Sequence, residues 1–254
     1  MTQNERLLSL IEYLLSERRD SGSVSVPHSD DERFQLYRSL INIRPPQPVT
    51  DEYLKIQDEY LQELSKERGI VRISDTEYMG GDLYLWQGDI TRLAADTIVN
   101  AANSEMLGCF HPCHNCIDNC IHTYAGIQLR EECSRLMAEQ GHEEPTGQAK
   151  ITRGYNLPAK HILHTVGPIV SGGLKKSQEY ALANCYRNCL TLAAEKAIVS
   201  IAFCCISTGV FGFPQERAAE IAIGTVKRYK PKGCLLYTSP SPRDRTRSRM
   251  PSSA

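Results

Sequence analysis

Residues 97–122 read TIVNAANSEMLGCFHPCHNCIDNCIH, and the architecture of the chain can be inferred outward from this segment. Thr97–Asn103 is mostly apolar and ends in asparagine, as expected for a buried strand that stops at the edge of a sheet. A helical pattern begins near Ile117. Leu107–His122 carries four cysteines and three histidines in sixteen residues. A loop rich in potential ligands, between a strand end and a helix start, is where α/β proteins build their sites.

The candidate metal ligands in this segment are Cys109, His114 and Cys116. They supply two thiolates and one imidazole, and three protein ligands leave a fourth position of zinc open for water or substrate. A closed four-ligand site is also possible, with Cys113, Cys120, His111 or His122 as the fourth donor. The competing interpretations are a redox pair of Cys113 and Cys116, or inert thiols packed in the core. An iron–sulfur cluster is disfavoured because the loop is rich in histidine.

Composition limits the class of protein. The chain has 254 residues, a hydrophobic content of 41% and a net charge of −1, which suits a packed core and disfavours a surface dedicated to nucleic acid. No run approaches the ~18 apolar residues of a membrane span, so we expect no membrane association. The first residues lack a signal-cleavage pattern, and ten cysteines without a secretory signal predict a reducing, cytoplasmic location.

Residues 1–69 are predicted to form a helical extension. Apolar residues recur at helical spacing in three segments. The segments are Leu7–Leu15, a stretch capped by Ser29 that continues to Ile41, and a stretch capped by Thr50 that ends before Gly69. Their apolar stripes need a partner surface, most simply the domain that follows.

Residues 70–233 are predicted to form a three-layer α/β domain, because short β-rich runs alternate with helical segments. The expected strands are Ile70–Ile73, Leu83–Gln87, Thr97–Ala101, Gln148–Thr152, His161–Val166 and Ser200–Ile206. The expected helices are Ile117–Gln140, Ser177–Lys196 and Pro214–Tyr229. Residues 234–254 break with this pattern, because they are rich in Ser, Pro and Arg and resemble the translation of a sequencing adaptor. We interpret them as a non-native tail, with a disordered basic tail as the alternative.

Two further segments are candidates for ligand binding. Ser207–Pro214 reads STGVFGFP, follows an apolar strand and opens a helix, so its backbone N–H groups can approach an anion. It has neither the lysine of a Walker motif nor a dinucleotide glycine pattern, and a plain turn is the alternative. Asp89 in the segment GDIT lies at a strand end, where it is either a binding residue or an ordinary turn aspartate.

The segments GDIT, IVNAANS, CIDNCIHTYAG, TGQAKIT, HILHTVGP and ISTGVFGFP follow one another in the order found in macrodomains, which bind ADP-ribose. The resemblance covers about Leu83 to Tyr229. Where most macrodomains carry a glycine run, this chain has GCFHPCHNC. Together with the helical extension, this replacement resembles the zinc-containing branch, the protein-ADP-ribose hydrolases of bacteria and fungi. The resemblance implies a mixed central sheet, and it implies that this chain has lost the last strand to its tail.

The resemblance also implies a role for individual residues. Asp89 and the Ile90 backbone would bind adenine, while Asn103 would contact the distal ribose. One zinc ion per chain would be held by Cys109, His114 and Cys116 beside that ribose. Ile117 and Asp118 would line the same end of the site. The diphosphate and distal ribose would be wrapped by Ser207, Thr208, Gly209, Val210, Phe211 and Gly212.

The expected activity is zinc-dependent removal of mono-ADP-ribose from modified proteins, with Asn103 and Asp118 as the catalytic residues. Cleavage at the anomeric carbon passes through an oxocarbenium-like state, so the site must place a water and stabilise the leaving group. The expected partners are an ADP-ribosylated protein and ADP-ribose itself. The alternatives are a non-catalytic ADP-ribose-binding module, a deacetylase of O-acetyl-ADP-ribose and a zinc-stabilised structural module.

Overall fold

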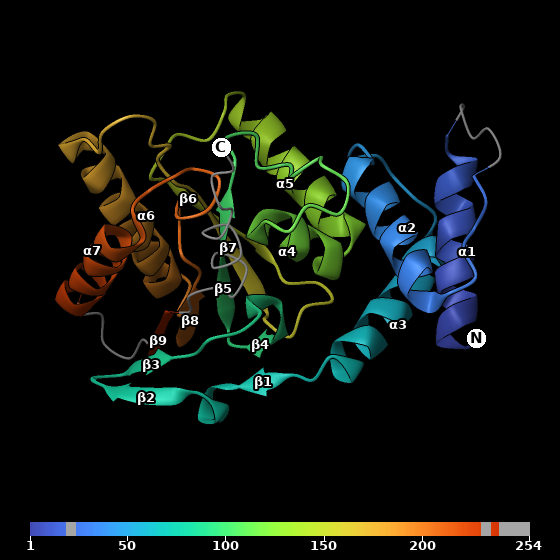
Figure 1. The fold of residues 1–254 in the computed structure, drawn as a ribbon, viewed down its shortest axis with the longest axis horizontal. Helices are drawn as coiled ribbons and strands as arrows, with labels where there is room; N and C mark the ends of the chain where they lie inside the picture. The colour runs from blue at the N-terminus through green and yellow to red at the C-terminus, as the bar shows by residue number, and fades with distance from the viewer. Residues whose placement is uncertain (19–23, 230–234, 239–254) are drawn as a thin grey trace, which may run out of the picture.

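The computed structural model describes residues 1–18, 24–229 and 235–238. The helices α1 (Gln3–Ser16), α2 (Asp30–Ile43) and α3 (Asp51–Glu67) come first along the chain. Each begins after a hydroxyl residue whose side-chain oxygen accepts a backbone N–H of the first turn, which satisfies a donor that the helix itself leaves unpaired. These capping residues are Thr2, Ser29 and Thr50. The predicted N-terminal helices are present, and Figure 1 shows them together at one side of the molecule.

The helices α1, α2 and α3 share a hydrophobic core of their own. Its buried members are Leu7, Leu10, Ile11, Leu14, Tyr37, Leu40, Ile41, Tyr53, Tyr60 and Leu61, with Ile127 added from a later helix. Ile127 brings the first turn of α5, in the α/β part of the chain, into this cluster. The amphipathic stripes therefore face one another and the following domain, as their pattern predicted.

The main sheet has seven strands among the described residues. Their spatial order is β2 (Glu77–Gly80), β3 (Leu83–Leu85), β9 (Leu235–Thr238), β8 (Ser200–Phe203), β5 (Thr97–Ala102), β7 (His161–Val166) and β6 (Ala149–Arg153). The inner pairs are parallel, and the outermost pairs β2–β3 and β6–β7 are antiparallel. The sheet is thus mixed, as expected. Every residue of β8 is buried, which fits a strand covered on both faces.

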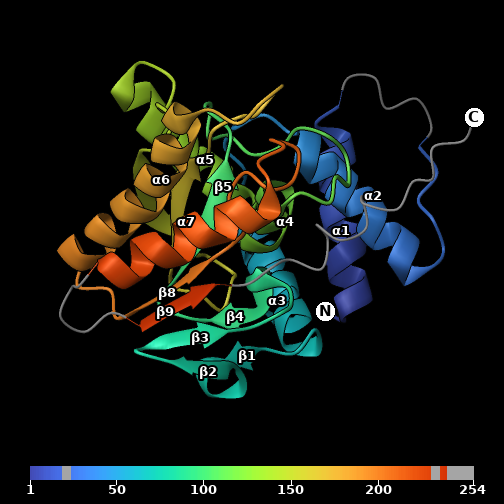
Figure 2. The ribbon, with the colours of Figure 1, turned by 60° about the vertical axis from the view of Figure 1, so that its left-hand side comes forward.

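Helices cover both faces of this sheet. In Figures 1 and 2, α6 (Lys176–Glu195) and α7 (Gln215–Arg228) lie on one side, and α4 (Ile117–Ala125) and α5 (Ile127–Gln140) lie on the other. A short parallel ladder joins β1 (Val71–Arg72) to β4 (Leu93–Ala94), and η1 (Ile73–Asp75) and η2 (Ile90–Arg92) are single 3₁₀ turns. The predicted three-layer fold is confirmed. In the described ranges no helix combines the length and apolarity needed to cross a membrane.

The predicted helix Ile117–Gln140 is wrong as a single element, because it divides into α4 and α5 at Gly126. Gly126 has φ +99°, and a Cβ there would lie 2.6 Å from Gln128 Oε1 and 2.7 Å from Gln57 Nε2. Only glycine fits that backbone at this point of close approach. The predicted strand at Ile70–Ile73 shortens to β1 and joins the small ladder instead of the main sheet. The largely exposed edge strand β2 was not predicted, since no buried face gave it a pattern.

The expectation that the sheet lacks its last strand is also wrong. Leu235–Thr238 forms β9, which pairs in parallel with β3 on one side and with β8 on the other. A Leu-Leu-Tyr-Thr run favours extended backbone, and each of its residues supplies the backbone N–H and C=O groups that a sheet ladder pairs. The rest of the predicted tail, residues 234 and 239–254, lies outside the described residues. The boundaries 1–69, 70–233 and 234–254 and the non-native origin of the last segment stay predictions.

Candidate active site

The candidate ligand-binding segments meet at one edge of the sheet. Strands β5 and β8 are parallel neighbours, so the loops that leave their carboxyl ends lie on the same side. Asn103 directly follows β5, and residues 207–212 lie between β8 and α7. The loop after β7 joins them, because the Val170 N–H donates to the Phe211 carbonyl at 2.8 Å. The segments that the sequence singled out are thus assembled at the carboxyl edge.

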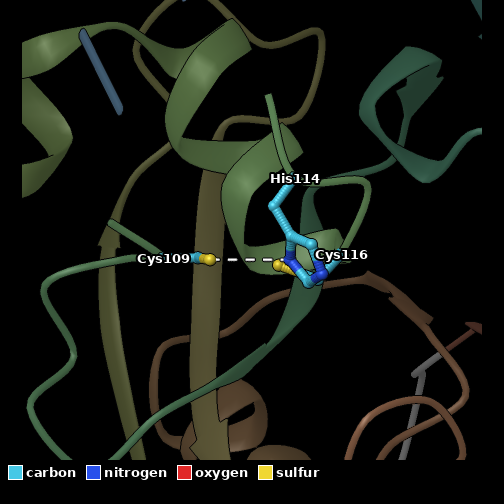
Figure 3. A group of neighbouring side chains, drawn as sticks. All are labelled: Cys109, His114 and Cys116. Carbon is cyan, nitrogen blue, oxygen red and sulfur yellow. Dashed lines mark hydrogen bonds between the residues drawn. The ribbon is translucent and has the colours of Figure 1, made fainter. Parts of the chain in front are cut away.

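Cys109, His114 and Cys116 come together, as predicted, in the loop between β5 and α4. Each offers one ligand atom, and these three atoms all lie within 4.8 Å of one another. The Cys109 Sγ and His114 Nδ1 atoms are 3.5 Å apart (Figure 3). All three residues are partly exposed, so a small molecule can approach them from solvent.

Local backbone features shape this loop. Cys116 is the N-cap of α4, and its Sγ accepts the Asn119 N–H at 3.4 Å. Cys113 has φ +52°, an unusual left-handed conformation for a residue with a side chain. Gly108 has φ +82°, and a Cβ at this position would come within 2.9 Å of the His122 ring. The loop therefore bends at Gly108, which precedes the ligand Cys109, and again at the strained Cys113, which follows it.

The three donors fit a zinc ion. Thiolate sulfur and imidazole nitrogen are ligands that zinc prefers, and bonds of ~2.3 and ~2.1 Å at a tetrahedral angle separate sulfur and nitrogen by about 3.6 Å. The 3.5 Å separation of Cys109 Sγ and His114 Nδ1 agrees with that value. Burial raises the pKa of the Cys116 thiol, so a cation that binds there must displace a proton.

The four alternative donors do not join the group in the described part of the chain. The Cys113 thiol donates to the Gln35 carbonyl at 3.3 Å, and the Cys120 sulfur accepts from Arg38 at 3.4 Å. His122 belongs to a separate buried cluster with Cys133 and His164. This arrangement favours three protein ligands over four, and the two cysteines of the proposed redox pair remain free thiols.

Asn103 and Asp118, the predicted catalytic residues, flank the metal-ligand loop in the sequence. Asn103 donates through Nδ2 to the Gly108 carbonyl at 3.0 Å, and its buried Oδ1 has no hydrogen-bond partner within the described residues. Asp118 is buried, and Asn100 donates to its Oδ1 at 2.7 Å. Burial raises the pKa of Asp118 to about 6, although the Asn100 hydrogen bond and the Arg130 charge oppose this shift. Asn100 was not singled out from sequence, where it read only as part of a buried strand.

Asp89 is held by the C-cap residue of α3, which the sequence did not single out for this site. Its Oδ2 accepts from Arg68 Nη2 at 2.7 Å, and its Oδ1 accepts from the Thr91 N–H at 3.0 Å. The Arg68 guanidinium also lies 3.6 Å from the centre of the Tyr124 ring. Ile90 follows Asp89 and is buried at the start of η2. The predicted adenine end is therefore built jointly by the helical extension and the α/β unit.

The predicted diphosphate loop is a tight turn. Ser207 has φ +65° and Gly212 has φ +68°, and the Phe213 N–H donates back to the Ser207 carbonyl at 2.9 Å. Thr208 donates through Oγ1 to the Cys205 carbonyl at 3.0 Å. The backbone N–H groups of Gly209, Val210 and Phe211 have no acceptor among the described residues. Free N–H groups that precede a helix N-terminus are suited to an anion.

Fold and site together define an α/β domain with two loops at the carboxyl edge of its sheet. One is the metal-ligand loop between β5 and α4, and the other is the segment 207–212, here called the anion loop. The sequence profile of the Macro domain matches residues 99–222. A "Protein-ADP-ribose hydrolase" from Treponema medium is 57% identical over 236 residues, covering 91% of this chain and 90% of that protein. One from Staphylococcus aureus (strain MRSA252) is 50% identical over 226 residues, covering 88% and 85%. The chain belongs to the macrodomain family.

Solved structures agree with this assignment. The Trypanosoma brucei macrodomain in complex with ADP-ribose is 27% identical, with a TM-score of 0.61 and coverage of 85% of this chain and 91% of that one. The Oceanobacillus iheyensis macrodomain with ADP is 39% identical, with a TM-score of 0.58 and coverage of 66% and 89%. Both are macrodomains with an adenine nucleotide, which matches the ligand class expected for the carboxyl edge.

Proposed function

We propose that this chain hydrolyses the bond between ADP-ribose and a modified protein, and that a zinc ion held by Cys109, His114 and Cys116 takes part. The hydrolase activity is supported by the relatives named protein-ADP-ribose hydrolase, which are 57% and 50% identical along nearly the whole chain. The role of the metal is supported by the three ligand atoms of Cys109, His114 and Cys116, which lie within 4.8 Å of one another. We also propose that the protein belongs to the zinc-containing branch of macrodomains and that it is located in the cytoplasm.

Different residues at the carboxyl edge of the sheet bind different parts of ADP-ribose. The free N–H groups of Gly209, Val210 and Phe211 receive the diphosphate. The unpaired Asn103 Oδ1 accepts a hydroxyl of the distal ribose, next to the metal-ligand loop. Asp89 and the backbone of Ile90 contact adenine, and Arg68 fixes the Asp89 carboxylate for that contact.

At the reacting end, the chain must orient the sugar and a water molecule. A bound zinc ion supplies Lewis acidity and can lower the pKa of a coordinated water to ~7. Asp118 is held by Asn100 and lies in the first turn after the N-cap ligand Cys116, so its carboxyl group has a fixed position close to the metal-ligand loop. We assign Asp118 the orientation of water or of the ribose hydroxyls, and Asn103 the retention of the ribose.

Substitution of a ligand tests this proposal. Cys116→Ala is expected to reduce release of ADP-ribose from a mono-ADP-ribosylated protein by more than the ~10–100-fold typical of losing an outer-shell partner of a metal. It should also lower the zinc content measured by elemental analysis. Binding of free ADP-ribose, measured by calorimetry, should persist. The matched control is Cys113→Ser, since this loop cysteine points to Gln35 and not to the other ligand atoms.

Two results would contradict the proposal in different ways. Wild-type turnover by a metal-free protein would remove zinc from the mechanism and leave the hydrolase activity intact. Tight binding of ADP-ribose without release by the zinc-loaded wild type would instead identify a non-catalytic ADP-ribose-binding module.

A further inference from the structure

One face of helix α2, in the N-terminal extension, lies against the metal-ligand loop. Its residues Gln35, Arg38 and Asn42 follow one another at helical spacing, so they share one side of the helix. The Gln35 carbonyl accepts the Cys113 thiol at 3.3 Å, and Asn42 Oδ1 accepts the Cys113 N–H at 2.9 Å. These contacts hold the strained residue directly before the ligand His114.

Arg38 makes the central contact of this face. It is only 7% exposed, and its Nη2 donates to the His114 carbonyl at 2.7 Å and to Asn119 Oδ1 at 3.0 Å. The Cys120 sulfur is a third, weaker acceptor at 3.4 Å. All three acceptors are neutral groups. Burying a guanidinium against neutral groups is unfavourable, which suggests that its position serves the loop and not stability.

Asn119 extends this contact to the other arm of the loop. Its Nδ2 donates to the Cys109 carbonyl at 3.3 Å and to the His111 carbonyl at 3.0 Å. Its own N–H donates to the Cys116 sulfur. Arg38 and Asn119 together therefore reach the backbone of two ligand residues and the side chain of the third.

We propose that Arg38 and Asn119 are positioning residues that hold Cys109, His114 and Cys116 at the separation a metal ion requires. The proposal rests on the metal role in the proposed function. A ligand loop bonded to fixed partners loses less conformational freedom when it binds a metal, because it is already ordered. The N-terminal extension is then a working part of the active site, and it acts through α2.

The test is the zinc affinity of Arg38→Met, measured by competition with a chromogenic chelator. The substitution keeps the apolar stem and removes the donors, so the affinity should fall by ~10–100-fold. Binding of free ADP-ribose should change by less than about 2-fold, since the Arg38 contacts in the described part of the chain do not reach residues 207–212. Arg38→Lys, which keeps a charged donor, should recover part of the zinc affinity.

Two further variants complete the experiment. Arg33→Met is the matched control, because Arg33 lies on the same helix but bonds to the Pro27 carbonyl and Asn4. It should bind zinc like the wild type. Asn119→Leu removes the link to Cys109 by another route and should weaken zinc binding even if Arg38→Met fails to fold.

The outcomes separate this inference from the function on which it rests. A wild-type protein that takes up no zinc overturns both the metal role and the positioning role. A wild type that binds zinc, with Arg38→Met and Asn119→Leu folded and binding equally well, overturns the positioning role alone. The same weakening in Arg33→Met would also overturn it, because the effect would then belong to the helix in general.

Discussion

His164 is a buried histidine that the fold keeps neutral. Its Nε2 lies 2.8 Å from Thr152 Oγ1 and its Nδ1 lies 3.1 Å from Asn100 Nδ2. Burial lowers its pKa to about 3. Burial likewise lowers the pKa of the neighbouring His122 well below its usual value. Because such a histidine takes up its proton more readily when unfolded, its contribution to stability is complete above pH ~6.5 and is lost as the pH falls toward 3.

We expect His164→Gln to make the protein less sensitive to acid. The pKa of His164 is ~6.5 in the unfolded state and about 3 in the folded state. Its titration therefore lowers the free energy of unfolding by about 2 kcal/mol when the pH falls from 7 to 5. Urea unfolding at these two pH values should therefore show a smaller loss in the variant by roughly that amount. The exposed His142→Gln should behave like the wild type. Equal losses in wild type and His164→Gln would show that His164 is not kept neutral.

At the level of elements, the break between α4 and α5 is set by backbone geometry. Gly126 ends one helix and begins the next with φ +99°, and the Gln57 side chain lies where a Cβ would be. Gly224 is a contrasting case inside α7, where the nearest atom to an added Cβ is 3.7 Å away. One glycine is required by its φ and its surroundings, and the other only weakens its helix.

Alanine at these two positions should have opposite effects. Gly126→Ala is expected to lower the free energy of unfolding by about 1–3 kcal/mol, because a left-handed backbone and a close contact both oppose it. Gly224→Ala should raise it by about 0.4–1 kcal/mol, since alanine favours the helix and restricts the unfolded chain. Chemical denaturation of both variants measures the difference. A neutral Gly126→Ala would mean that α4 and α5 can join into one helix.

At the level of the whole molecule, buried polar contacts join the helical extension to the α/β unit. Arg130 of α5 donates to the carbonyls of Ile41 and Arg44. The Ile127 N–H donates to Gln57 Oε1 at 3.1 Å, and Asn156 Nδ2 donates to Asp58 at 2.7 Å. Losing either part would leave buried donors and acceptors of the other unpaired, which is unfavourable. The two parts are therefore expected to unfold together.

Destabilising the extension should then be detected in the α/β unit. Ile11 is fully buried in the helical core, and Ile11→Ala should cost about 2–5 kcal/mol. Trp86 is the sole tryptophan and packs against the core of the α/β unit, so its fluorescence reports on that unit. The urea midpoint from Trp86 should shift downward in Ile11→Ala. The exposed Ile223→Ala should leave the free energy of unfolding within about 0.5 kcal/mol of the wild-type value.

A Trp86 transition that stays in place, while far-UV circular dichroism shows an earlier loss of helix, would contradict this coupling. The extension would then be an independently folding unit.

Several of these features are predictable from the order of the residues. The caps at Ser29 and Thr50 and the apolar stripes predicted the helices, and the ligand types at Cys109, His114 and Cys116 predicted their cluster. The strand β2 and the break at Gly126 were missed, because an exposed edge has no buried face and a single glycine inside a helical pattern is usually tolerated. The strand β9 was excluded on composition, although strand pairing depends chiefly on the backbone.

Patterns within short segments were enough for most of the helices, the buried strands and the candidate metal ligands, because periodicity, capping and ligand chemistry act over a few positions. The roles of the other candidate site residues came from the resemblance to macrodomains and stay predictions. The hydrogen-bond partners of those residues were decided by tertiary packing. Arg38 contacts His114 and Asn119 across 76 and 81 positions of sequence, and Arg68 contacts Asp89 across 21. Which residues become such partners depends on how the helical extension packs against the α/β unit. Hydrogen bonds between segments distant in sequence form only after both segments have folded against each other.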